Sequence, residues 1–299
     1  MLIYDYMIEK PKYTIEKQDI KVPRLSAGES AIIFQRHGKY ERDKTSERSG
    51  SITEDAIEDL TARDQAFFDE LIANEPNPED VMVLFVSSDT RYGQGYRSME
   101  TAQIAEDTAI EAFNAAGLNP TAQIINLNPA FKTNVFDKTG QAVRPDIRIH
   151  EPEFLDNKGY VQFLKDKYSD GIALTPKAWA MHEMDADKEV REELGAEGVY
   201  DIVDRTKRAL AVMERYARVF HVNNPGKKLI IWAASHYDTL SPLAKDATDT
   251  DFGEYLPVDY GAGITIELKK GQAPTFEIAG ERVSLSLATT AAKAIESKL

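Results

Sequence analysis

The chain has 299 residues, carries a formal net charge of −14 and contains no cysteine. The absence of cysteine excludes structural disulfides, thiolate nucleophiles and cysteine–zinc sites, and the acidic balance argues against a nucleic-acid partner, which would require a basic surface. Because no apolar run reaches the length of a membrane span or of a signal-peptide core, we expect a cytoplasmic protein without membrane contacts.

Short apolar runs alternate with longer amphipathic stretches along the chain. Apolar runs typical of buried parallel strands occur at Ala31–Phe34, Val81–Val86, Gln123–Leu127 and Leu229–Ala234. Helical periodicity is found at Thr53–Ala73, Met99–Ala116 and Val199–Phe220. This alternation predicts an α/β fold in which helices cover both faces of the sheet.

The C-terminal part and two long segments follow a different pattern. Gly263–Leu268 and Thr275–Ile278 are typical of two strands in an antiparallel hairpin. Residues 129–160 and 169–198 are rich in charge and turn formers with little periodicity, which predicts an insertion or lid. With no repeat or low-complexity linker in view, we predict a single domain, 1–299. Within it, residues 1–25 form an N-terminal extension and 129–198 the insertion or lid region.

The first chemical motif is Arg36-His37-Gly38, directly after the apolar run Ile32–Phe34. In an open parallel sheet, ligands bind just beyond the carboxyl ends of the strands, so Arg36 and His37 lie where chemistry is expected. Gly38 allows the backbone to turn sharply and approach a ligand. The tripeptide alone is a weak signal, because a surface loop can carry the same residues.

Two later strand ends carry further polar residues. Ser87-Ser88 follows the run Val81–Val86, and Ser235-His236 follows the run Leu229–Ala234. Between them, Arg97-Ser98-Met99-Glu100-Thr101-Ala102 opens a predicted helix. An arginine beside the free N–H groups of a helix N-terminus favours an oxyanion site.

In this order and at these separations, the three motifs resemble those of the histidine phosphatase superfamily, also called the phosphoglycerate-mutase-like family. Ser51-Ile52-Thr53-Glu54 and Arg148-Ile149-His150-Glu151 are smaller matches to it, and the resemblance spans Ile32 to Leu268. It implies a three-layer α/β sandwich, in which helices flank a mixed, mostly parallel central sheet. It also implies phosphohistidine chemistry that uses no metal and no cofactor.

The resemblance implies a role for each matching residue. His37 would attack phosphorus, which requires the neutral imidazole. The phosphoryl oxygens would be bound by Arg36, Arg97, His236 and Ser88. His236 would also contribute to catalysis, best as a cation, a form that a phosphate dianion favours. Glu151 would protonate the leaving oxygen and then act as a base.

Two of these roles have competing candidate residues. Ser88 and Arg97 are nine residues apart, where the family has four, and Arg91 lies four residues after Ser87. We favour Arg97 because only it has Thr101-Ala102 at the expected distance. For the general acid, Glu153 and Asp238 compete with Glu151.

These motifs predict a phosphomonoester hydrolase that acts on a small-molecule or peptide-borne phosphate ester. A phosphoglycerate-type mutase is the alternative enzyme, but Lys39-Tyr40-Glu41-Arg42 lacks the Glu-Ser-x-x-Asn pattern typical of glycolytic mutases. A catalytically weak phosphate-binding scaffold with the same fold is the non-enzymatic alternative. The sequence leaves the physiological substrate and the oligomeric state open.

Overall fold

A computed structural model describes residues 11–43, 45–88, 93–125, 157–171 and 174–288. Its centre is a six-stranded sheet in the order β2-β3-β1-β4-β5-β6. The strands are β1 (Ser30–Arg36), β2 (Val81–Ser87), β3 (Lys228–Ser235), β4 (Gly263–Leu268), β5 (Thr275–Ile278) and β6 (Glu281–Ser284). β1, β2 and β3 run parallel, whereas β4, β5 and β6 add antiparallel strands beyond β1. The predicted mixed sheet with a parallel centre is confirmed.

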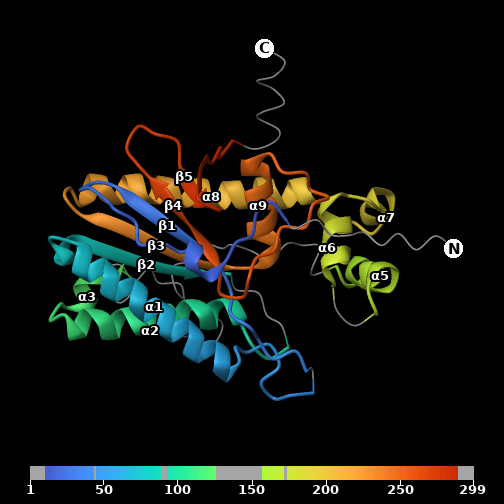
Figure 1. Ribbon diagram of the computed structural model, residues 1–299, viewed down its shortest axis with the longest axis horizontal. Helices are drawn as coiled ribbons and strands as arrows, with labels where there is room; N and C mark the ends of the chain where they lie inside the picture. The colour runs from blue at the N-terminus through green and yellow to red at the C-terminus, as the bar shows by residue number, and fades with distance from the viewer. Residues whose placement is uncertain (1–10, 44, 89–92, 126–156, 172–173, 289–299) are drawn as a thin grey trace, which may run out of the picture.

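Helices cover both faces of this sheet, as Figure 1 shows. One face carries α1 (Glu54–Asn74), α2 (Arg97–Ala115) and the short α3 (Pro120–Gln123), and the other carries α8 (Val199–Asn223) and α9 (Tyr237–Thr248). Along β1 successive side chains point to opposite faces. Ile33 therefore lies in the same buried cluster as Phe68 of α1, whereas Phe34 lies in the same buried cluster as Leu240 of α9. The predicted three-layer arrangement is confirmed.

One predicted strand, Gln123–Leu127, is reduced to a single bridge among its described residues. Residues 123–127 read as an apolar strand, but Pro120–Gln123 forms a helical turn. The Asn119 side chain caps this turn by accepting a hydrogen bond from the Thr121 N–H at 3.1 Å, and a proline at the first helical position is preorganised for a helix. After it, Ile124 makes a single parallel bridge to Val83, and residues 126–156 lie outside the described residues.

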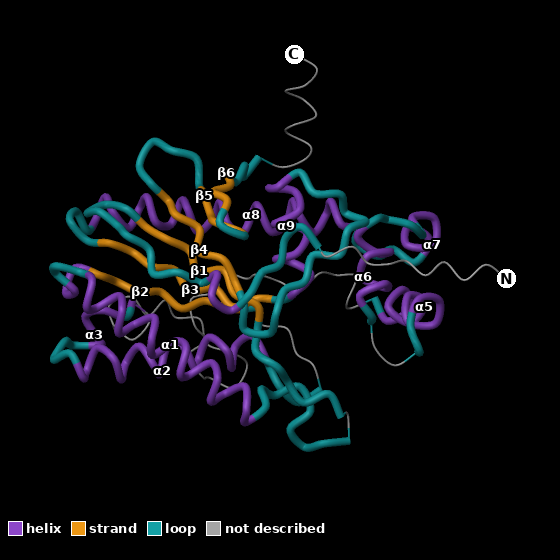
Figure 2. Tube along the Cα trace, in the orientation of Figure 1, coloured by secondary structure: helices purple, strands orange, loops and turns teal. Residues whose placement is uncertain are grey.

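The segments flanking the sheet also differ in part from expectation. Near the N-terminus, before η1 (Lys17–Asp19), Ile15 bridges to Val258 and lies in the core. Residues 169–198 contain more regular structure than predicted, in α6 (Pro176–Glu183) and α7 (Lys188–Glu193). With α5 (Lys158–Tyr168) they form a small helical cluster beyond α9 (Figure 2). The division into one domain, extension and insertion stays a prediction.

Among the described residues, no helix is both long and apolar enough to cross a membrane. The 3₁₀ turn η2 (Pro78–Asp80) leads directly into β2.

Two helix ends follow the signals in the sequence. Thr53 is the N-cap residue of α1, where the Ser51–Glu54 motif predicted a helix start. Just after the C-terminal end of α2, Gly117 has a φ of +74°. That left-handed conformation favours glycine and ends the helix.

Candidate active site

The strand register brings three polar strand ends together. Arg36 of β1 pairs with Ser235 of β3, so His37 and His236 are the first residues beyond two neighbouring parallel strands. The His37 N–H donates to the Ser235 carbonyl at 2.8 Å, and the Ser88 N–H donates to the Ala234 carbonyl at 3.0 Å. The two imidazole ring centroids lie 5.2 Å apart, and both side chains are buried.

Arg97, the first residue of α2, joins the two imidazoles. Its Nε donates to His37 Nε2 at 2.9 Å, and its Nη2 lies 3.3 Å from His236 Nδ1. The loop before α2 is fixed because the Gly95 N–H donates to the Ser49 carbonyl at 2.9 Å. The predicted convergence of His37, His236 and Arg97 is therefore present in the structure. The competing Arg91 lies outside the described residues.

Hydrogen bonds fix the tautomer of His37. Its Nδ1 lies 2.7 Å from the Gly38 carbonyl, and a carbonyl can only accept, so Nδ1 carries the proton. Nε2 then presents its lone pair, which accepts from Arg97. Burial, followed by the charge of Arg97, lowers the pKa of His37 well below its usual range. The imidazole is consequently neutral, the form that a nucleophile requires.

His236 has the same protonation state with a different set of partners. Its Nδ1 accepts from Arg97, so Nε2 carries the proton; it lies 3.0 Å from Ser88 Oγ and 3.3 Å from Ser98 Oγ. Burial and the Arg97 charge also lower the pKa of His236 well below its usual range. A bound phosphate dianion would act in the opposite direction and favour the cationic form expected from the sequence.

Two residues of the α2 motif support the site and had no assigned role from the sequence. Ser98 contacts His236, as described above. Thr101 Oγ1 accepts from the Gly38 N–H at 3.0 Å and donates to the Arg97 carbonyl at 2.8 Å. Arg97 and Thr101 are four residues apart on a helix and therefore lie on one face, so the motif spacing contained this signal.

Arg36 lies beside the site but hydrogen bonds neither imidazole. In the part of the chain that the structure describes, its Nη1 donates to the Val258 carbonyl, and its buried Nε has no hydrogen-bond partner. The guanidinium lies over the rings of Tyr260 and Tyr237, with Cζ 3.8 Å and 5.5 Å from the ring centroids. Its charge nevertheless contributes to the lowered pKa of both histidines.

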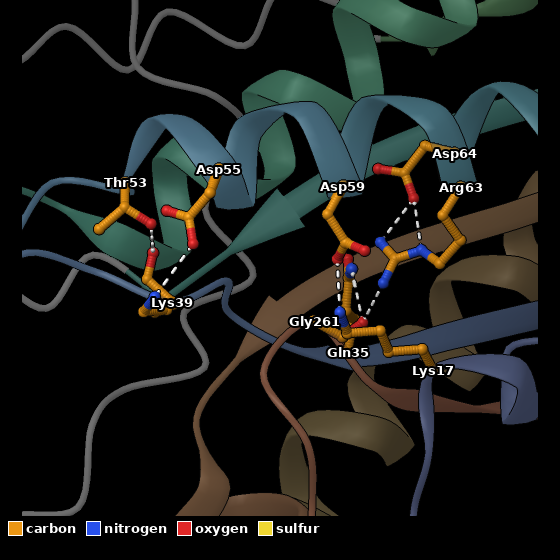
Figure 3. A network of polar contacts seen from close by, with 9 residues as sticks. All are labelled: Lys17, Gln35, Lys39, Thr53, Asp55, Asp59, Arg63, Asp64 and Gly261. Atoms are coloured by element: carbon orange, nitrogen blue, oxygen red, sulfur yellow. Dashed lines mark hydrogen bonds and ion pairs between the residues drawn. The ribbon is translucent and has the colours of Figure 1, made fainter.

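The loop that carries Tyr260 is anchored to β1 and α1. The Gly261 carbonyl accepts from Gln35 Nε2 at 3.1 Å and from the Arg63 guanidinium, and Figure 3 shows both side chains meeting it. The Gly261 N–H donates to the His37 carbonyl at 3.1 Å. Gly261 has a φ of +76°, so a side chain at this position would be strained.

The acidic residue predicted from sequence has no described position, since Glu151 and Glu153 lie outside the described residues. The third candidate, Asp238, lies in the first turn of α9 and is buried. Among the described residues, its Oδ2 has no hydrogen-bond partner. Burial raises the pKa of Asp238 to about 6, although Arg205 and Arg97 act in the opposite direction.

A hollow of about 500 Å³ opens beside the segment that follows His37. Gly38 and Tyr260 belong to its wall. Across it, Lys39 pairs with Asp55 at 3.0 Å, one of the contacts drawn in Figure 3. Its wall combines charged side chains with apolar ones, and the two imidazoles and Arg97 are not part of it. Within the described ranges, no group of three or more side chains is arranged to hold a metal ion.

No protein-family model matches the sequence, and the search of curated proteins gives no match. Solved structures do match. A mycobacterial hydrolase is 12% identical, covers 87% of this chain and 99% of its own, and has a TM-score of 0.40. The phosphoserine phosphatase of Entamoeba histolytica is 12% identical, covers 86% of this chain and 98% of its own, and has a TM-score of 0.36. The multiple inositol polyphosphate phosphatase of Bifidobacterium longum is 9% identical, covers 92% of this chain and 92% of its own, and has a TM-score of 0.38.

Two of these three proteins are phosphatases, the class whose motifs the sequence resembles. Identities and TM-scores of this size assign no function to the chain. The geometry of the site is therefore the basis for a function.

Proposed function

We propose that the chain is a phosphomonoester hydrolase of the histidine phosphatase type, which forms a phosphohistidine on His37. The observation that supports it is the contact of one buried guanidinium with both imidazoles, at 2.9 Å and 3.3 Å. Arginine binds phosphoryl oxygens bidentately, and a neutral histidine beside it is a nitrogen nucleophile. The two residue types serve complementary parts of one reaction.

The first chemical step breaks the ester bond. His37 Nε2 attacks phosphorus in line, the N–P bond forms, and the bond from phosphorus to the leaving oxygen breaks. The leaving oxygen takes a proton from a carboxylic acid, which we assign to Glu151 with Asp238 as the alternative. Throughout, the Gly38 carbonyl holds the Nδ1 proton and thereby supports the positive charge that develops on the ring.

The second step returns the enzyme to its starting state. The carboxylate formed in the first step takes a proton from water, the water oxygen attacks phosphorus, and the N–P bond breaks to release inorganic phosphate. Arg97, Arg36, His236 and Ser88 stabilise the charge on the equatorial oxygens in both steps. The cationic groups among them must attract the anion at short range, because the whole chain has a net charge of −14 and repels an anion at long range.

The decisive experiment replaces the proposed nucleophile. His37→Ala should reduce hydrolysis of p-nitrophenyl phosphate by about 10³-fold or more, because the nitrogen that would form the N–P bond is removed. His221→Ala is the matched control. His221 hydrogen bonds Ser30 Oγ at 2.6 Å from the last turn of α8 and should leave turnover unchanged.

Rapid-quench labelling with a ³²P ester should trap acid-labile, alkali-stable label on the wild-type chain and none on His37→Ala. Equal turnover by wild type and His37→Ala would contradict the proposal. A wild-type protein that binds phosphate without hydrolysing any ester would support the scaffold alternative. Transfer of the label to a phosphoglycerate in preference to water would support the mutase.

A further inference from the structure

Arg36 is held in an unusual way for a partly buried cation. Buried arginines ordinarily pair with a carboxylate. Among the described residues, no acidic side chain lies within ion-pair distance of Arg36, although ion pairs are numerous elsewhere in the chain. Among these residues the guanidinium makes one hydrogen bond, which it donates to the Val258 carbonyl. The guanidinium also lies over the rings of Tyr260 and Tyr237.

The chemical consequence concerns anion binding. A carboxylate would cancel the charge of Arg36 and occupy the N–H donors that a phosphate needs. A ring face attracts the same cation through its quadrupole, yet it takes up no N–H donor and adds no negative charge. The Nε of Arg36, buried and without a partner among the described residues, is a donor that this arrangement leaves available.

Both rings are themselves held in place. The Tyr237 hydroxyl donates to the Leu256 carbonyl at 3.3 Å, and its ring centroid lies 5.0 Å from that of Trp179 in α6. The Tyr260 hydroxyl accepts from Arg42, and the next residue in the chain, Gly261, is anchored by its own carbonyl and N–H. The two rings therefore offer a fixed surface to the guanidinium.

We propose that Tyr260 and Tyr237 position Arg36 to bind a phosphate dianion by holding its guanidinium through their ring faces in place of a carboxylate. The proposal rests on the proposed function, because it takes phosphate as the ligand of Arg36. The Tyr260 ring centroid lies 5.8 Å from that of His37, so the held cation and the nucleophile are neighbours. The two tyrosines are positioning residues and act on phosphate only through Arg36.

The first test uses inorganic phosphate as the probe, measured by titration calorimetry and as a competitive inhibitor. Tyr260→Leu removes the ring and should weaken phosphate binding by about 2- to 30-fold, the range that cation–π contacts provide. KM should rise by a similar factor while kcat changes less, because His37 and Arg97 remain. Tyr260→Phe keeps the ring and should recover most of the lost affinity. Equal losses in Phe and Leu variants would overturn the proposal.

A double-mutant cycle separates positioning from a general structural effect. In an Arg36→Met background, Tyr260→Leu should change phosphate affinity by less than about twofold, because the cation that the ring holds is gone. The same loss in both backgrounds would overturn the proposal. Tyr200→Leu is the matched control, since Tyr200 on α8 is 54% exposed, and it should change nothing.

A fluorinated phenylalanine series at position 260 makes the test independent of variant folding. Fluorine weakens the ring quadrupole with little change of shape, so phosphate affinity should fall stepwise with fluorine number. An unchanged affinity across the series would overturn the proposal. Tyr260-dependent phosphate binding without any ester hydrolysis would contradict the proposed function alone, and hydrolysis with Tyr260-independent binding would contradict this inference alone. A wild-type protein that does not bind phosphate would contradict both.

Discussion

His37 and His236 show how local hydrogen bonds give chemically different imidazoles at one site. In His37 the proton is on Nδ1 because the Gly38 carbonyl accepts it, so Nε2 presents its lone pair. In His236 the proton is on Nε2, directed at the hydroxyls of Ser88 and Ser98. The lone pair of each ring is directed at Arg97. At this scale a single guanidinium orders both imidazoles at the same time.

The identity of the general acid is a prediction at the residue scale. If Glu151 protonates the leaving oxygen, Glu151→Gln should slow hydrolysis of an alkyl phosphate by about 10²-fold or more. Hydrolysis of p-nitrophenyl phosphate should slow much less, because nitrophenolate leaves without a proton. Steady-state rates across a series of leaving groups measure the difference.

Asp238→Asn is the comparison variant, since it removes a buried carboxyl of raised pKa without changing the side-chain shape. It should slow all leaving groups to a similar degree. If the loss of rate depended steeply on the leaving group in Asp238→Asn but not in Glu151→Gln, the acid role would be assigned to Asp238.

Among the elements, the contact between α6 and α9 depends on a buried ion pair. Lys245 of α9 pairs with Glu183 of α6, and both side chains are almost fully inaccessible to solvent. Lys245 also donates to the Phe252 carbonyl at 3.0 Å, while Ser241 Oγ donates to Glu183 at 3.3 Å. Trp179, one turn earlier in α6, packs against the core that contains Tyr237. The helical cluster is thereby joined to the helix that starts beside His236.

Breaking this pair should destabilise the protein strongly. Lys245→Met leaves Glu183 buried without its partner and should lower the free energy of unfolding by about 3–5 kcal/mol. The double variant Lys245→Met/Glu183→Leu removes both charges and should restore most of that loss. Urea unfolding followed by circular dichroism measures both values. A double variant as unstable as the single one would show that the ion pair is not the cause.

Over the whole molecule, buried ionisable groups make stability depend on pH in two opposing ways. Burial lowers the pKa of His182 to about 3, so its contribution to stability is complete above its usual pKa of 6.5 and is lost as the pH falls below it. Burial raises the pKa of Asp64 to about 6 and of Glu183 to about 7. The contributions of these two carboxyls are complete at low pH and are lost as the pH rises through those values.

His182 provides a test that isolates one of these groups. At pH 5 the unfolded chain gains a proton on His182 that the folded chain does not, which costs about 2 kcal/mol relative to pH 7.5. The difference in unfolding free energy between the two pH values should therefore be smaller by about that amount in His182→Gln than in wild type. Urea titrations at both pH values measure it. An equal change in unfolding free energy between the two pH values in both proteins would contradict the assignment of this pH dependence to His182.

The sequence by itself determined the parts of this protein that depend on local pattern. The apolar runs located β1, β2 and β3, and the residues that follow them placed Arg36, His37, Ser88 and His236 at strand ends. These predictions succeeded because burial on both faces leaves an apolar run in any single strand, and parallel strands end at one edge. At 123–127 a strand was predicted, whereas Gln123 ends a helical turn that Asn119 and Pro120 set, and among the described residues only Ile124 pairs with the sheet.

Only the tertiary structure decided which side chains surround the strand ends. Arg36 and Val258, whose carbonyl holds it, are 222 residues apart, and no periodicity connects Arg36 to the tyrosines that face it. The raised pKa of Asp238 likewise comes from its burial in the folded chain. Local patterns record whether a residue is buried, whereas its neighbours depend on how distant elements pack. That packing determines the chemistry of Arg36 and Asp238.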